Sequence, residues 1–155
     1  MAHYILSAFA DEVSSDFTKQ LEYLKSKDIS YIEPRNINGT GVAAITLEEA
    51  KNAKKMLDDY KIGVSSIGSP IGKISVEDDF ADHIRLFEHV MDIAELFETK
   101  NIRMFSFFVD EAEADQKTDE VVEKLSKMVA YAEKHDVILL HENEKGIYGN
   151  IARRC

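Results

Sequence analysis

Apolar segments short enough to be β-strands alternate with longer amphipathic segments along this 155-residue chain. Five of the apolar segments begin near residues 4, 29, 62, 101 and 137. The segment after the first carries Phe17, Leu21 and Leu24 at the i, i+4, i+7 spacing of one helical face. Repeated strand–helix units build a parallel sheet joined by right-handed crossovers, so the alternation predicts a single α/β domain over residues 1–155.

Local signals predict where the first two helices begin. Ser14 and Ser15 are good N-cap residues for the first helix, in which Gln20 is expected to face away from the apolar stripe. Thr46-Leu47-Glu48-Glu49 has the pattern of a capping box, in which a threonine hydroxyl and a glutamate carboxylate satisfy free backbone amides. It predicts a second helix to about Tyr60, with a buried stripe made of Leu47, Ala50, Ala53 and Leu57.

The remaining connections follow from composition and periodicity. Pro34 ends the second strand, and the glycine- and asparagine-rich residues 36–41 are predicted to form a loop. A third helix is predicted from about Asp79 to Phe97. A fourth follows the acidic stretch Asp110–Asp119, and its apolar face is expected to contain Val121, Val122, Leu125, Met128, Val129 and Ala132.

The fifth apolar segment, Val137–Leu140, leads directly into a cluster of polar and ionisable residues. Its four apolar residues without polar alternation predict a strand that is buried on both faces, as in parallel sheets. Functional residues of parallel α/β proteins gather at the carboxyl ends of the strands. Glu142, two residues after this run, is therefore the first candidate for a functional side chain.

Two architectures are built from this alternation, the doubly wound sheet and the (β/α)8 barrel. A doubly wound nucleotide-binding protein normally has a glycine-rich turn after its first strand, but Ser7–Asp11 contains no glycine. The loop Gly68–Lys73 ends in Gly-Lys but lacks the spacing of a Walker A phosphate loop. The sequence therefore does not favour a nucleotide-binding sheet.

Four segments at predicted strand ends resemble one family of barrels: Ile32–Arg35, Ser66–Lys73, Ile102–Phe107 and Leu139–Asn143. They are similar to successive strand ends of the xylose isomerase-like superfamily, specifically its sugar phosphate isomerase/epimerase members. The resemblance implies the first five βα units of a barrel that ordinarily has eight and takes about 250 residues. The expected fold is thus an incomplete (β/α)8 TIM barrel of about five parallel strands alternating with helices.

By this resemblance, the parent enzyme is a metal-dependent sugar or sugar phosphate isomerase or epimerase that moves a substrate α-proton. Glu142 matches the family's metal-binding carboxylate, which can also serve as an acid/base group; a solvated carboxylate at the barrel rim is the alternative. Oxygen ligands suit Mg²⁺ or Mn²⁺, and an added histidine suits Zn²⁺ or Co²⁺. The family's other ligands follow strands six to eight, so the 155-residue chain is expected to hold no metal on Glu142 alone and to be inactive.

Three further residues are candidates for contacting a small sugar substrate. Glu33 and Arg35 flank Pro34 at the end of the second strand, where they would hold a substrate hydroxyl or form an ion pair at the rim. Lys73, on the loop after the third strand, would meet a substrate phosphate or carboxylate, or would simply be solvated.

Neighbours of these candidates carry weaker expectations. Arg103 lies early in the fourth strand and is expected to pair at the amino-terminal face. Side chains alternate along a strand, so His141 is expected to point away from Glu142 and to pack under the helices. Glu144 is a second loop carboxylate and an alternative metal ligand.

Charge argues against some partners. The net charge of −10 repels nucleic acid and anionic membranes, and the acidic residues are expected on solvated helix faces. Residues 1–4 lack the pattern of a signal peptide and no segment is long and apolar enough for a membrane span, so a cytoplasmic protein is expected. Endonuclease IV shares the superfamily barrel, but it uses zinc-binding histidines where this chain has Ser69 and Phe108, and it is disfavoured.

Five strands do not close a barrel, so the first and fifth are expected to keep unpaired edges. Such a chain is expected to form a homo-oligomer through its exposed sheet edges. Two further possibilities remain: the chain is a remnant of a longer enzyme, or it is a non-catalytic half-barrel.

Overall fold

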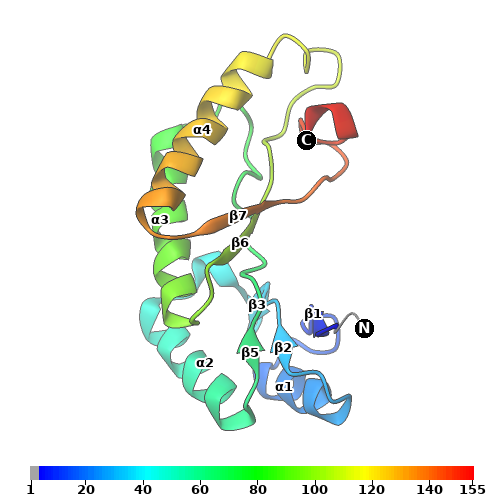
Figure 1. Ribbon diagram of the computed structural model, residues 1–155, viewed down its shortest axis with the longest axis vertical. Coiled ribbons are helices and arrows are strands. Elements are labelled where there is room, and N and C mark those ends of the chain that lie inside the picture. Colours follow the sequence, from blue (N-terminus) through cyan, green and yellow to red (C-terminus); the bar gives the residue numbers. More distant parts are fainter. Residues whose placement is uncertain (1–3) are drawn as a thin grey trace.

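Strands and helices alternate along most of the chain in the computed structural model, which describes residues 4–155 (Figure 1). Residues 1–3, at the start of the predicted domain, lie outside the described residues. The elements are β1 (Ser7–Ala8), α1 (Phe17–Ser26), β2 (Tyr31–Ile32), β3 (Asn36–Ile37), β4 (Thr40–Gly41), a 3₁₀ turn at Val42–Ala44, α2 (Leu47–Tyr60), β5 (Gly63–Val64), α3 (Phe80–Leu96), β6 (Asn101–Met104), α4 (Thr118–Lys134), β7 (Ile138–His141) and a 3₁₀ turn at Ala152–Arg154.

Apart from the β3–β4 hairpin, the strands are arranged in parallel and in the order in which they occur along the chain, as in the wall of a barrel. β1 pairs with β2 and β2 with β5, while β6 pairs with β7. A parallel bridge between Ile67 and Ile102 joins the two groups, and the Arg103 N–H donates to the Ile67 carbonyl at 2.9 Å. A doubly wound sheet would reverse this order. The predicted incomplete TIM barrel is therefore confirmed.

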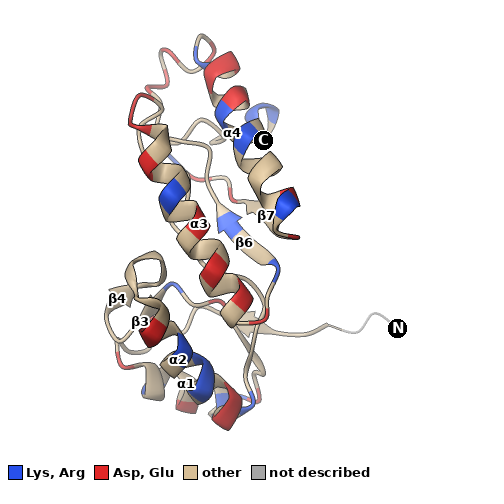
Figure 2. Cartoon of the chain, turned by 90° about the vertical axis from the view of Figure 1, so that its left-hand side faces the viewer, with Lys and Arg blue, Asp and Glu red and all other residues tan. Residues whose placement is uncertain are grey.

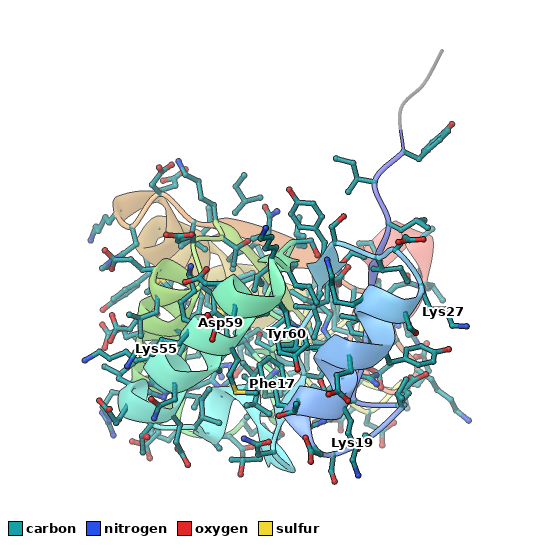
Figure 3. The ribbon with its side chains drawn as sticks, turned by 90° about the horizontal axis from the view of Figure 1, so that it is seen from below. Phe17, Lys19, Lys27, Lys55, Asp59 and Tyr60 are labelled. Carbon is teal, nitrogen blue, oxygen red and sulfur yellow. The ribbon has the colours of Figure 1, made fainter. Side chains whose placement is uncertain are left out.

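Helices cover one side of these strands. α2, α3 and α4 follow one another along that side, and α1 packs against α2 (Figure 1). Phe17 lies between α1 and α2, whereas Lys19 and Lys27 point outward (Figure 3). Acidic residues recur along α3 and alternate with its buried positions (Figure 2). No helix among residues 4–155 is long and apolar enough to cross a membrane.

The start of α1 differs from the prediction. Asp16, rather than Ser14 or Ser15, is the N-cap, and its carboxylate accepts from the Lys19 N–H at 3.2 Å. Gln20 is fully buried, which corrects its predicted outward orientation. Its side-chain amide donates to the carbonyls of Ser14 and Asn36, so it fastens the helix to the segment after β2.

The segment predicted as a loop after Pro34 is a β-hairpin. β3 and β4 pair antiparallel, with Ile37 opposite Thr40. The two turn residues, Asn38 and Gly39, both have positive φ, at 51° and 80°. Asn-Gly is the sequence that two-residue hairpin turns favour because both residues accept this backbone conformation.

The capping box of α2 is confirmed in both directions. The Thr46 hydroxyl accepts from the Glu49 N–H at 3.2 Å, and the Thr46 N–H donates to the Glu49 carboxylate at 2.7 Å. Leu47, however, is 38% exposed and does not belong to the buried stripe of Ala50, Ala53 and Leu57. It is the first residue of the helix and precedes the turns that face α1 and α3.

The last helix and strand are less covered than predicted. Val122 and Val129 on α4 are 52% and 46% exposed, because α4 packs on one flank only. On β7, Ile138 and Leu140 are 54% and 42% exposed, so the strand is not buried on both faces. Among residues 4–155, β7 pairs with β6 alone and β1 with β2 alone, which confirms the expected free edges.

Candidate functional site

The segments after β2 and β5, together with β6, line a pocket of about 270 Å³. We call it the rim pocket. Its charged lining residues are Arg35 after β2, Lys73 after β5 and Arg103 in β6, and no carboxylate belongs to the lining. The wall opposite is formed by the 3₁₀ turn at Val42–Ala44, which the β3–β4 hairpin places there. Glu33 lies outside this lining, although it directly precedes Pro34 in the same segment.

Arg103 connects the ends of three strands. One N–H group donates to the Glu142 carboxylate at 3.2 Å, and another donates to the carbonyls of Gly68 and Ser69 at 3.0 and 3.3 Å. The predicted pairing of Arg103 at the amino-terminal face is therefore wrong. The register opposes Arg103 to Leu140, and its long side chain reaches toward the carboxyl end.

Lys73 meets a carboxylate of the chain itself. Its ammonium lies 2.7 Å from the Glu144 carboxylate and 4.3 Å from the centre of the Phe105 ring. Glu144, the alternative metal ligand, is thus engaged by a cation. Lys73 and Glu144 lie close together although 70 residues separate them, because the loops after β5 and β7 meet at the same rim.

Arg35 forms an ion pair at the rim. Its guanidinium donates to Asp11 at 2.9 Å and to Glu12 at 3.0 Å. Asn36 also donates to Asp11, at 2.6 Å. Burial raises the pKa of Asp11, but the hydrogen bonds from Arg35 and Asn36 outweigh it and hold the pKa of that carboxyl below its ordinary value.

Sequence reasoning did not identify Asp11 or the two aromatic residues of the rim, Phe9 and Phe105. A signal for Asp11 was present, since it follows the first strand and Arg35 follows the neighbouring second strand. Carboxyl ends of adjacent parallel strands lie side by side, so an acidic residue after one and a basic residue after the next are placed to pair.

His141 takes a different position from the one predicted. It is exposed rather than packed under helices, and its Nε2 lies 3.0 Å from the Ser106 hydroxyl. The Ser106 oxygen is fully buried and accepts from the Gly149 N–H at 2.7 Å. Gly149 is required at this contact, since a Cβ there would come within 2.4 Å of the His141 ring.

Glu142 is the carboxylate for which the sequence predicts metal binding. Its side chain is 43% exposed, and it follows β7 at the rim as predicted. Among residues 4–155, no three His, Cys, Asp or Glu side chains gather as a metal ion requires. The described residues therefore fit a divalent cation only as contributors of one or two carboxylates.

Comparison with known proteins identifies the fold. The model of the xylose isomerase-like TIM barrel family matches residues 21–153. No curated protein matches the sequence.

Three similar solved structures illustrate the match. The probable 3-DHS dehydratase AsbF of Bacillus anthracis, involved in petrobactin synthesis, is 19% identical, with a TM-score of 0.75 over 94% of this chain and 54% of that one. A xylose isomerase-like TIM barrel protein of Mycobacterium smegmatis in complex with magnesium is 14% identical, with a TM-score of 0.72 over 97% and 58%. The 3-keto-D-glucoside 4-epimerase YcjR of E. coli is 9% identical, with a TM-score of 0.69 over 93% and 58%. This chain thus spans little more than half the length of each.

Proposed function

The chain belongs to the xylose isomerase-like TIM barrel family, and from this premise we propose that its rim serves a metal-dependent sugar or sugar phosphate isomerase or epimerase. The observation that carries the proposal is the position of Glu142, a partly exposed carboxylate at the carboxyl end of β7 beside a pocket lined by cations. Similar structures include a sugar epimerase and a probable dehydratase, so the fold alone does not select the reaction. The proposal therefore depends on the site.

Each residue has a role in this proposal. The Glu142 carboxylate acts as one of two acid/base groups that move the substrate α-proton, with its partner in further βα units, and provides one metal ligand, while Arg103 orients it through the 3.2 Å hydrogen bond. Glu33, Arg35 and Lys73 hold the sugar at the rim. A divalent cation such as Mg²⁺, Mn²⁺, Zn²⁺ or Co²⁺, when bound, would polarise the substrate carbonyl; the M. smegmatis structure holds magnesium.

We further propose that residues 1–155, as a single domain, do not catalyse this reaction by themselves. Glu142 and Glu144 each face a cation, and a lone carboxylate in water binds divalent ions weakly because affinity needs several ligands held together. In this proposal the other ligands come from further βα units of an eight-unit barrel.

The experiment follows metal-dependent exchange of a sugar α-proton with solvent deuterium by NMR. An eight-unit barrel that contains these five units should catalyse exchange, and Glu142→Gln should abolish it, whereas Glu133→Gln on the exposed face of α4 should not. Unchanged exchange in Glu142→Gln would rule out the proposed function. Exchange catalysed by the 155-residue chain alone would contradict its proposed inactivity.

A second candidate is a non-catalytic half-barrel that associates with another copy of itself. The exposed apolar side chains of Ile138 and Leu140 on the free edge of β7, together with Ile5 and Leu6 before β1, favour it. Unpaired strand edges with apolar side chains are surfaces on which chains associate.

A further inference from the structure

The three cations that line the rim pocket alternate with two aromatic rings that lie outside its lining. The Phe9 ring centre lies 4.4 Å from the Arg35 guanidinium carbon and 5.4 Å from that of Arg103. The Phe105 ring centre lies 5.0 Å from the Arg103 guanidinium carbon and 4.3 Å from the Lys73 ammonium. The order is therefore Arg35, Phe9, Arg103, Phe105, Lys73, which we call the cation–aromatic row.

This row gathers three positive charges that would otherwise repel one another. Each cation is attracted to the face of a ring, by about 0.5–1 kcal/mol at a partly exposed site. Phe105 is fully buried, so its ring has little freedom to move away from the cations. The row therefore places three like charges at fixed positions in one wall.

The carboxylates that neutralise the row approach it from outside the pocket. Asp11, Glu12, Glu142 and Glu144 each contact one cation of the row, but none of them lines the pocket. The Nε of Arg103 is buried and has no partner among residues 4–155, so it does not contribute an accessible donor. The pocket lining thus contains three cationic side chains and no carboxylate.

The shape of the pocket also depends on Gly68. A Cβ at this position would come within 2.7 Å of the Arg35 side chain and 3.1 Å of the Pro34 carbonyl oxygen. The absence of a side chain lets Arg35 lie across the segment after β5 and stand beside Phe9. Gly68 also supplies a carbonyl that holds Arg103 in place.

We propose that the rim pocket binds the phosphoryl group of a phosphorylated sugar. This rests on the proposed function in taking the rim as the place where the sugar binds. Guanidinium groups match the oxygens of a phosphoryl group with paired N–H donors, and Lys73 adds a point charge. A phosphoryl dianion matches three cations better than a carboxylate monoanion does. Glu142 and Glu144 compete with it, because they already hold Arg103 and Lys73.

Titration calorimetry of the 155-residue chain with inorganic phosphate, at low ionic strength and without metal, tests this proposal. Lys73→Gln should weaken phosphate binding about fivefold, the equivalent of about 1 kcal/mol. Glu144→Gln should tighten it about threefold, since it releases Lys73. Lys134→Gln, an exposed lysine on α4, is the matched control and should change nothing. Circular dichroism of each variant checks that the fold is kept.

The proposal is overturned if the unaltered chain binds no phosphate, or if Lys73→Gln and Lys134→Gln bind phosphate equally well. It is also overturned if acetate binds as tightly as phosphate, because that result would indicate a carboxylate subsite instead. A different measurement tests the proposed function. Glu142→Gln should lose α-proton exchange in the eight-unit barrel yet bind phosphate at least as tightly in the 155-residue chain, because Arg103 is released. Retained exchange with the expected phosphate binding would reject the enzyme role and leave the subsite intact.

Discussion

Arg103 donates to Glu142 across the two strands β6 and β7, over 3.2 Å, while the same guanidinium holds the carbonyls of Gly68 and Ser69. One side chain thereby joins the segments after β5 and β7 to the strand between them. The side chain of Arg103 is only 15% exposed, so these hydrogen bonds are largely shielded from water. The geometry of the rim therefore depends on Arg103 as much as on the strands.

Replacing Arg103 by methionine should lower the free energy of unfolding by about 2–3 kcal/mol, because it leaves two carbonyls and a carboxylate without their donor. Urea denaturation measures the change. Arg153→Met is the control, since Arg153 is 66% exposed in its ion pair with Asp115 and should contribute less than about 1 kcal/mol. Equal effects of the two substitutions would show that Arg103 does not stabilise the rim.

Gly72 should tolerate no side chain. Its φ is +86°, and a Cβ would come within 1.9 Å of the Phe105 carbonyl oxygen. Gly146 has the same φ of +86°, but a Cβ there meets nothing within 4 Å. Gly146→Ala should therefore cost about 1 kcal/mol of backbone strain, and Gly72→Ala about 1–3 kcal/mol more from the clash. Similar melting temperatures for the two variants would contradict this assignment.

Local signals predicted much of the fold because the interactions they describe lie within a few residues. The capping box of Thr46 and Glu49 is formed within a single helical turn, and the order of the strands follows from their alternation with helices. The Asn38-Gly39 turn was equally local, but its composition was interpreted as a loop although it also fits a hairpin.

The rim was less predictable because its contacts join residues far apart in sequence. Glu142 could be placed at a strand end from its position alone, whereas its pairing with Arg103 depends on strand register and side-chain length. The exposure of Leu140 was missed for a related reason. An apolar run indicates surface that needs cover, but not whether another segment covers it.

Acid should destabilise the chain through His83. This buried ring accepts the Gly72 N–H on Nε2 at 2.8 Å, and burial holds the pKa of His83 below its ordinary value. The unfolded chain therefore binds a proton more readily than the folded one. The stability that the neutral ring contributes is complete above about pH 6.5 and is lost as the pH falls from there toward the lowered folded-state pKa.

Urea denaturation between pH 7.5 and 5 measures this loss, at up to about 1.4 kcal/mol for each pH unit. His83→Gln keeps an acceptor for Gly72 without a titrating group, so its stability should depend less steeply on pH. Asp79 and Asp82 lie near His83 at the start of α3. They are present in the unaltered chain and in His83→Gln, so their titration contributes to both pH profiles. Identical pH profiles for the two would contradict the role of His83.

The free edge of β7 should support association of two copies of the chain. Ile138 and Leu140 point to the same face of β7 and are 54% and 42% exposed, and an apolar strand edge of this kind pairs readily with another chain. Leu140→Lys should yield monomers in sedimentation velocity at micromolar concentration, where the unaltered chain should sediment as an oligomer. Val129→Lys on α4 removes a side chain of similar exposure, 46%, away from the edge and should not change the oligomeric state. If the unaltered chain is a monomer, this interface does not exist. If only Val129→Lys dissociates the oligomer, the interface lies on α4 instead.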